Sequence, residues 1–280
     1  MKPETGRRFS EKWFGAAILT LGLILLGQTL ALVTDPLFPA EEKSGLWAAF
    51  RTYMADGWLW LMFIPVMLAH PDDRETVRQL VSRGHGKRAA AGAVLGFALI
   101  AVCYGAAWAA GDLTPVFVGA SAGELALMLF AVLIQSGAEE LAFRGFLLGR
   151  CLRDLKKPWM AILLNAVLFG ALHLANENVT PAGVLGTAAM GALLAVLMWK
   201  NESLWQVILL HTAWNWLQNI IFGLPNSGWV FSCSLLGAAN VTKTATFFYD
   251  PYFGLEGSWL CPLLAAAAAL FLIYRYKAKL

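Results

Sequence analysis

The stretch SGAEELAFRGFLLGR, residues 136–150, carries two glutamates and an arginine inside a run of apolar residues that is typical of a membrane-spanning helix. Near the centre of such a helix, each ionisable side chain costs roughly 2.5 to 3.5 kcal/mol. Glu139, Glu140 and Arg144 would together cost about 7 to 10 kcal/mol if nothing compensated their charge. The stretch therefore predicts a membrane protein with a polar site inside it.

The composition of the whole chain agrees with a membrane setting. Of its 280 residues, 59% are hydrophobic and 14% are charged, whereas about 25% are charged in soluble domains. The charges gather between apolar runs, as a bilayer that offers no water requires. We predict an all-α, polytopic membrane helix bundle in the lipid bilayer. The net charge of +3 needs no nucleic-acid partner to explain it.

Apolar runs long enough to cross a hydrocarbon core of about 30 Å predict about eight transmembrane helices. Their expected ranges are 13–34, 47–69, 89–110, 123–149, 158–176, 180–199, 203–222 and 257–275. The segment 223–256 is too apolar for a simple linker, so we expect part of it to re-enter or cap the bundle. Cys233 and Cys261 both fall toward this outer side, where they are available to pair.

Lys and Arg residues set the expected orientation, because cytoplasmic loops carry an excess of them. With the N-terminus inside, only Lys43, Arg51 and Lys243 fall on the outer side, and Arg144 lies within a helix. Both termini are therefore expected in the cytoplasm. The inside set comprises Lys2, Arg7, Arg8, Lys12, Arg74, Arg78, Arg83, Lys87, Arg88, Arg150, Arg153, Lys156, Lys157, Lys200, Arg275, Lys277 and Lys279.

The three charges of the opening stretch face different neighbours. Glu140 and Arg144 are four residues apart, about 40° on the helical wheel, which is the spacing of an intrahelical ion pair. Glu139 is displaced by about 100° from Glu140, so it lacks a local counter-charge. The pair is either purely architectural or a support for a site. Glu139 is either a polar contact between helices or a carboxylate available for chemistry.

Partners for Glu139 occur in two later helices. His211 and Asn215, within HTAWN, are again four residues apart and share one helix face. His173 closes the sequence FGALH in another helix. A lone His or Asn in a membrane helix is more often an interhelical hydrogen-bonding residue, but three that converge with an unpaired Glu favour a functional site.

These four side chains suit the activation of water. A carboxylate can take the proton, while imidazoles and an amide orient the water or stabilise the oxyanion that forms on a carbonyl. Glu139, His173 and His211 are also the ligand types of a catalytic zinc site, although no HExxH sequence is present. The residues thus predict hydrolysis with either no cofactor or Zn²⁺.

Three short motifs resemble a known family pattern. EELAFRG at 139–145, FGALH at 169–173 and HTAWN at 211–215 are similar in order and spacing to the EExxxR, FxxxH and HxxxN motifs of the CPBP family. That family, also called Abi, contains type II CAAX prenyl endopeptidases and bacteriocin-processing enzymes. The resemblance covers about residues 125–275, and FGLEGSW at 253–259 is similar to the Gly-rich segment of bacterial members.

The resemblance implies an intramembrane endopeptidase whose cavity opens toward the cytoplasmic side. Residues 1–122 would form three N-terminal membrane helices, and residues 123–280 would form the catalytic helix bundle. Glu139 would be the general base, with Glu140, Arg144 and Phe169 supporting the site. The catalytic set would comprise Glu139, His173, His211 and Asn215, and the candidate metal ligands would be Glu139, His173 and His211.

The expected substrate is a peptide or a membrane protein, and the expected location is a bacterial cytoplasmic membrane, as an integral multi-pass protein. Two other classes remain open on the sequence. One is a non-catalytic immunity or binding protein of the same fold. The other is a proton-coupled transporter that uses Glu139 and the histidines as a relay, although no inverted repeat is visible.

Overall fold

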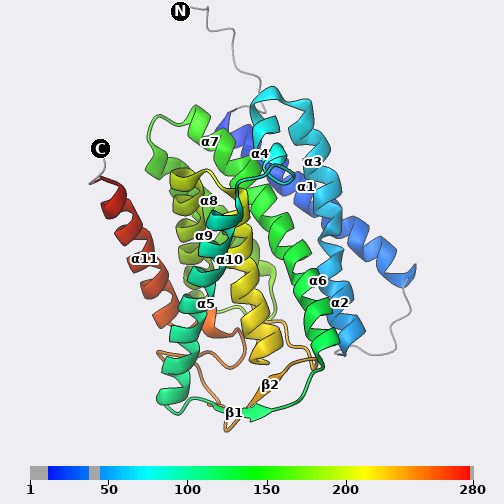
Figure 1. Ribbon diagram of the computed structural model, residues 1–280, viewed down its shortest axis with the longest axis vertical. Helices are drawn as coiled ribbons and strands as arrows, with labels where there is room; N and C mark the ends of the chain where they lie inside the picture. Colours follow the sequence, from blue (N-terminus) through cyan, green and yellow to red (C-terminus); the bar gives the residue numbers. More distant parts are fainter. Residues whose placement is uncertain (1–11, 38–44, 278–280) are drawn as a thin grey trace, which may run out of the picture.

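The structure is a computed structural model that describes residues 12–37 and 45–277 (Figure 1). Within these ranges it is a bundle of helices with one small two-stranded sheet, which confirms the predicted all-α polytopic architecture. The helices are α1 (Trp13–Thr34), α2 (Leu46–Ala55), α3 (Gly57–Ala69), α4 (Arg74–Arg78), α5 (Gly86–Ala109), α6 (Ala122–Glu140), α7 (Leu148–Asp154), α8 (Pro158–Leu172), α9 (Pro181–Asn201), α10 (Leu204–Trp216) and α11 (Leu260–Lys277). The strands are β1 (Thr114–Phe117) and β2 (Leu236–Ala239), which pair antiparallel.

Six helical segments in the described part of the chain are long and apolar enough to cross a membrane, so the predicted count of eight is not confirmed. They are Trp13–Leu37, Leu46–Ala69, Gly86–Ala109, Ala122–Asp154, Pro158–Ala175 and Pro181–Asn201. The predicted eighth helix corresponds to a shorter apolar helix, Leu260–Arg275. The predicted seventh corresponds to α10 and the π-helical turn Leu217–Ile221 that follows it. This segment is helical but not among the six.

The basic loops gather at one end of the bundle, drawn at the top of Figure 1. The α3–α5 connection contacts α7 through Asp73 and Arg150, whose side chains lie 2.7 Å apart, and contacts the start of α10 through Gln79. The sheet and the segment 222–259 lie at the opposite end. This arrangement agrees with the expectation that the basic loops share one side of the membrane, and the cytoplasmic assignment of that side stays a prediction.

Several residues used in the charge argument lie outside the described residues. They are Lys2, Arg7, Arg8, Lys43 and Lys279. The backbone of Lys277 is described, but its side chain is not.

Close approach of α5 and α10 depends on two glycines. A Cβ atom at Gly92 would lie 2.0 Å from the backbone oxygen of Gln206, and one at Gly96 would lie 2.5 Å from that of Leu210. Backbones at this distance leave no room for any side chain. The two glycines therefore set the position of α10, which carries His211.

The segment 222–259 caps the bundle, as predicted from its apolar composition. β2 pairs with β1, and Tyr249 and Phe253 are fully buried beneath the helices. Residues Asn226, Ser227 and Glu256 line a cavity inside the bundle. All four cysteines are free, so Cys233 and Cys261 do not pair.

The hydrophobic core runs through both halves of the chain. One cluster of buried side chains includes Phe63 of α3, Ile100 of α5, Phe146 of the turn between α6 and α7, and Leu210 of α10. The segments predicted as 1–122 and 123–280 thus pack as one unit around a shared core.

Candidate active site

The opening stretch forms a helix that changes its winding beside the predicted site. α6 ends at Glu140, residues Leu141–Leu147 form a π-helical turn, and α7 continues from Leu148. The sequence predicted one regular α-helix over 123–149, so the π-helical turn is a correction. Such turns insert extra residues into an α-helix and occur frequently at functional sites. The i, i+4 contact between Glu140 and Arg144 survives the change.

Glu140 binds two positively polarised groups at once. Its Oε1 atom accepts hydrogen bonds from Arg144 Nη1 and from His211 Nδ1, both at 2.9 Å. Arg144 also donates to the backbone oxygen of Gly191 at 3.2 Å, and its guanidinium lies 4.2 Å from the centre of the Phe169 ring. Glu140 and Arg144 are fully buried. The predicted ion pair is present, and it also fixes the imidazole of His211.

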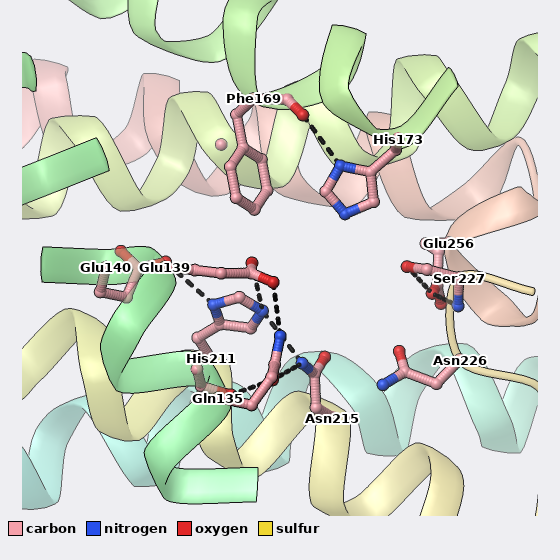
Figure 2. A network of polar contacts seen from close by, with 12 residues as sticks. Gln135, Glu139, Glu140, Phe169, His173, His211, Asn215, Asn226, Ser227 and Glu256 are labelled. Carbon is pink, nitrogen blue, oxygen red and sulfur yellow. Dashed lines mark hydrogen bonds and ion pairs between the residues drawn. The ribbon is translucent and has the colours of Figure 1, made fainter. Parts of the chain in front are cut away.

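Glu139 points away from that pair into the cavity, where Figure 2 shows it beside His211, Gln135 and Asn215. Its Oε1 atom accepts a hydrogen bond from Gln135 Nε2 at 2.5 Å. Its Oε2 atom is buried without a hydrogen-bond partner in the described part of the chain, and it lies 4.0 Å from His211 Nε2. The separation of roles between Glu139 and Glu140 follows the sequence analysis.

Gln135 was missed by the sequence reasoning. Its Oε1 atom accepts from Asn215 Nδ2 at 3.1 Å, so the Gln135 side chain joins Asn215 to Glu139. Asn215 Nδ2 also lies 3.1 Å from His211 Nε2. The signal was available, because Gln135 stands four residues before Glu139 on the same helix.

His173 lies across the cavity, where α8 gives way to a 3₁₀ turn. Its Nδ1 atom is 2.8 Å from the backbone oxygen of Phe169, which fixes Nδ1 as the donor and leaves Nε2 facing the cavity (Figure 2). The Phe169 ring lies near both imidazoles, with its centroid 4.9 Å from that of His173 and 6.1 Å from that of His211. His173 is in electrostatic range of Glu139 and His211. The four predicted site residues therefore share one cavity.

The cavity has a volume of about 310 Å³ and extends from Glu139 toward the segment 222–259. Phe143 is buried in the π-helical turn and lines the cavity, and Phe146 and Leu147 of the same turn are buried as well. The resemblance implied an opening toward the cytoplasmic side. The side to which the cavity opens stays a prediction.

A second polar cluster, also missed from the sequence, lines the far end of the cavity. Glu256 accepts hydrogen bonds from the backbone nitrogen of Ser227, from Ser227 Oγ at 2.8 Å and from Gln218 Nε2. Asn226 Nδ2 donates to Tyr53 Oη at 3.3 Å. Burial raises the pKa of the Glu256 carboxyl above its ordinary value, and its hydrogen bonds oppose that rise. The cluster ties the segment 222–259 to the helices around Glu139.

The predicted metal ligands do not converge as a three-ligand set. His211 uses Nδ1 toward Glu140, and its Nε2 faces the amide nitrogen of Asn215 at 3.1 Å. Of the three predicted ligands, Glu139 and His173 are the two that present an uncommitted ligand atom to the cavity. Within residues 12–37 and 45–277, no three His, Cys, Asp or Glu side chains are arranged to hold a metal ion. The arrangement does not fit a catalytic zinc site, which takes three protein ligands.

Comparison with known proteins covers the same region. Residues 121–217 match the family model described as Type II CAAX prenyl endopeptidase Rce1-like, and this segment contains all four predicted site residues. The uncharacterized protein YyaK of Bacillus subtilis (strain 168) is 47% identical over 60 residues, which are 21% of this chain and 20% of that relative. The similarity thus spans about a fifth of the relative's length. No solved structure matches the chain.

The helix bundle, the position of the three motifs within it and the matching family model lead to one conclusion. In this integral, multi-pass membrane protein, residues 121–217 are similar to the Rce1-like family of type II CAAX prenyl endopeptidases.

Proposed function

We propose that the protein is an intramembrane endopeptidase that hydrolyses peptide bonds of peptides or membrane-associated proteins. One observation carries the proposal. The Oε2 atom of Glu139 is buried at the cavity without a hydrogen-bond partner among the described residues, close to His211 and opposite His173. A buried acceptor without a donor is unfavourable, and a bound water would supply the donor.

In this proposal Glu139 is the general base. It takes a proton from the water while the water oxygen attacks the carbonyl carbon of the scissile bond, which gives a tetrahedral oxyanion. The proton then passes from Glu139 to the amide nitrogen, the C–N bond breaks, and a carboxyl and an amine product leave. In its neutral form, His173 accepts the second water proton in a hydrogen bond through Nε2, which orients the attacking lone pair.

The remaining residues act through these two. Glu140 accepts from His211 Nδ1, so it holds that imidazole in one tautomer and one orientation beside Glu139. Asn215 Nδ2 donates its hydrogens to Gln135 Oε1 and to His211 Nε2. We therefore assign Asn215 as a positioning residue for the His211 ring and for Gln135, and not as a donor to the substrate.

The test compares wild type, Glu139→Ala and Glu139→Gln in detergent or liposomes. Each is incubated with a synthetic peptide library, and the products are identified by mass spectrometry. We expect both variants to lose the wild-type products, with a fall in rate of at least about a hundredfold, because the general base is missing. Size-exclusion profiles and thermal unfolding show whether each variant is folded.

Glu124→Gln is the matched control, because Glu124 is a half-buried carboxylate in the first turn of the same helix and does not line the cavity. It should retain the wild-type products. Identical products from folded Glu139→Gln and wild type would reject the enzyme and leave the binding protein and the transporter as candidates. Loss of cleavage with a chelator, with recovery on adding Zn²⁺, would contradict the metal-free route proposed here.

A further inference from the structure

Asp56 is a carboxylate in the cavity that the proposed hydrolysis does not use. It stands where α2 ends and α3 begins, it is half-buried, and its side chain lines the same cavity as Glu139. The two carboxylates lie in electrostatic range of each other. A charged group at this depth is costly unless a partner compensates it.

No structural role accounts for the Asp56 side chain. Although it precedes α3, it makes no capping hydrogen bond to that helix. It forms no hydrogen bond or ion pair with any residue of the described chain. The cation next to it in sequence, Arg51, is bound to Asp35, with Nε and Oδ1 3.0 Å apart.

The described residues that line the cavity include acidic side chains but no basic ones. The lining contains the carboxyl groups of Asp56, Glu139 and Glu256 and no Lys or Arg. Glu256 is satisfied by donors from Ser227 and Gln218, and Arg144 is committed to Glu140 outside the lining. Among the described residues, Glu139 Oε2 is buried without a donor, and no hydrogen bond or ion pair joins the Asp56 side chain to another residue. A cleft lined by one sign of charge with low-dielectric walls attracts ligands of the opposite sign.

We propose that Asp56 binds a cationic nitrogen of the substrate, close to the bond that Glu139 hydrolyses. The nitrogen belongs to a lysine or arginine side chain or to a free N-terminal amine of the peptide. This inference rests on the proposed function, since both use the same cavity. Asp56 is then a specificity-determining residue, and the charge that it places in the membrane is compensated when substrate is bound.

The experiment uses the full chain and ten-residue apolar peptides that carry one lysine at successive positions. Each peptide has a twin with norleucine in place of lysine, and both are made with free and with acetylated N-termini. We expect wild type to cleave the best lysine peptide with a kcat/KM about ten- to hundredfold above its twin, as expected for loss of a charged hydrogen bond. Asp56→Asn should bring that ratio close to one.

Two further variants sharpen the result. Asp35→Asn removes a nearby carboxylate outside the cavity and should keep the wild-type ratio. In a third peptide series glutamate replaces the lysine. Asp56→Lys should cleave these glutamate peptides faster than the lysine peptides. If that variant does not fold, the lysine and norleucine twins with wild type and Asp56→Asn still decide the question. An unchanged preference for the cationic peptide in folded Asp56→Asn, or wild-type rates that depend on neither the lysine nor the free N-terminal amine, would overturn the proposal.

Peptide binding, measured by fluorescence polarisation, separates this inference from the proposed function. If wild type cleaves nothing beyond the Glu139→Gln blank, the endopeptidase proposal fails, while tighter binding of lysine peptides that Asp56→Asn abolishes still supports the cation site. If free N-termini are favoured over acetylated ones and Asp56→Asn removes that advantage, the N-terminal amine is the cation. If lysine peptides are favoured over norleucine peptides when both are acetylated, the side chain is the cation.

Discussion

At the scale of single residues, the Glu140 carboxylate connects the ion pair of α6 to the imidazole of α10. Arg144 and His211 both donate to its Oε1 atom. The sequence analysis left open whether Glu140 and Arg144 were purely architectural. Glu140 contacts His211 and is held by Arg144, so this ion pair contributes to the geometry of the site. Loss of the pair should therefore affect both the stability of the fold and the position of the His211 ring.

Replacing Arg144 by alanine should reduce stability strongly. The change leaves the fully buried Glu140 without its cation, and breaking a buried ion pair costs about 3 to 5 kcal/mol. Unfolding in detergent, followed by intrinsic fluorescence, measures the loss. Arg78→Ala is the control, because its ion pair with Glu75 is exposed and should contribute about 0 to 1 kcal/mol. Equal losses in both variants would contradict the burial argument.

Gln135 should affect turnover more than substrate affinity. Gln135→Leu removes the donor to Glu139 and the acceptor for Asn215, so the base loses its fixed orientation. We expect kcat to fall about ten- to hundredfold with little change in KM, as for other losses of positioning. Ser136→Ala, which removes only a hydroxyl that donates to Gln135, should have a much smaller effect. A rise in KM with normal kcat would refute the assignment.

The raised pKa of Glu256 makes a prediction about pH and stability. A carboxyl whose pKa is raised by folding binds its proton more tightly in the folded state. Its contribution to stability is fully present below the unfolded value of about 4.3 and is lost as pH rises through the folded value.

Glu256→Gln removes this titration and serves as the reference. Thermal unfolding should show wild type most stable relative to the variant at about pH 4, with the advantage shrinking by about pH 8. An advantage that grows with pH would show that the hydrogen bonds from Ser227 and Gln218 outweigh burial.

At the scale of helices, the packing of α5 against α10 determines where His211 stands. Gly92→Ala should push the helices apart, because the new Cβ would meet the Gln206 backbone oxygen at 2.0 Å. We expect a loss of about 1 to 3 kcal/mol in unfolding free energy and a parallel loss of activity. Gly105→Ala on the same helix meets nothing within 4 Å, so it should be neutral or slightly stabilising.

Helical spacing predicted contacts within a helix and missed those between distant segments. The Glu140–Arg144 pair and the His211–Asn215 face followed from residues four positions apart. The contact of Glu140 with His211 spans 71 residues and depends on how α6 and α10 cross. The π-helical turn at Leu141–Leu147 has no simple sequence signal, since apolar residues fill α and π turns equally well.

At the scale of the whole molecule, composition predicted the architecture, and the positions of Lys and Arg predicted which loops gather together. The wall of the cavity formed by Ser227 and Glu256 was not predictable, because its backbone follows no helical or strand period. The break at Asp56, which divides the predicted helix 47–69 into α2 and α3, was hidden by the apolar residues on both sides.

The orientation of the whole molecule can be tested by labelling. Ser82, between α4 and α5, and Thr244, in the segment 222–259, are exposed, and the four native cysteines are buried. The two segments lie at opposite ends of the bundle. In intact cells, a membrane-impermeant maleimide should label Thr244→Cys and leave Ser82→Cys unlabelled until the cells are lysed. The reverse pattern would place the basic loops outside and contradict the positive-inside assignment.

The segment 222–259 lies beyond the family match at 121–217, yet it supplies one wall of the cavity. The Glu256–Ser227 hydrogen bond within the segment and the pairing of β2 with β1 hold that wall in shape without contacts to Glu139 or His211. In the proposed function, the hydrolytic residues lie within 121–217, whereas this wall and Asp56 lie outside that range. Exchange of the segment 222–259 between relatives should then change which peptides are bound, while Glu139, His173 and His211 keep their places.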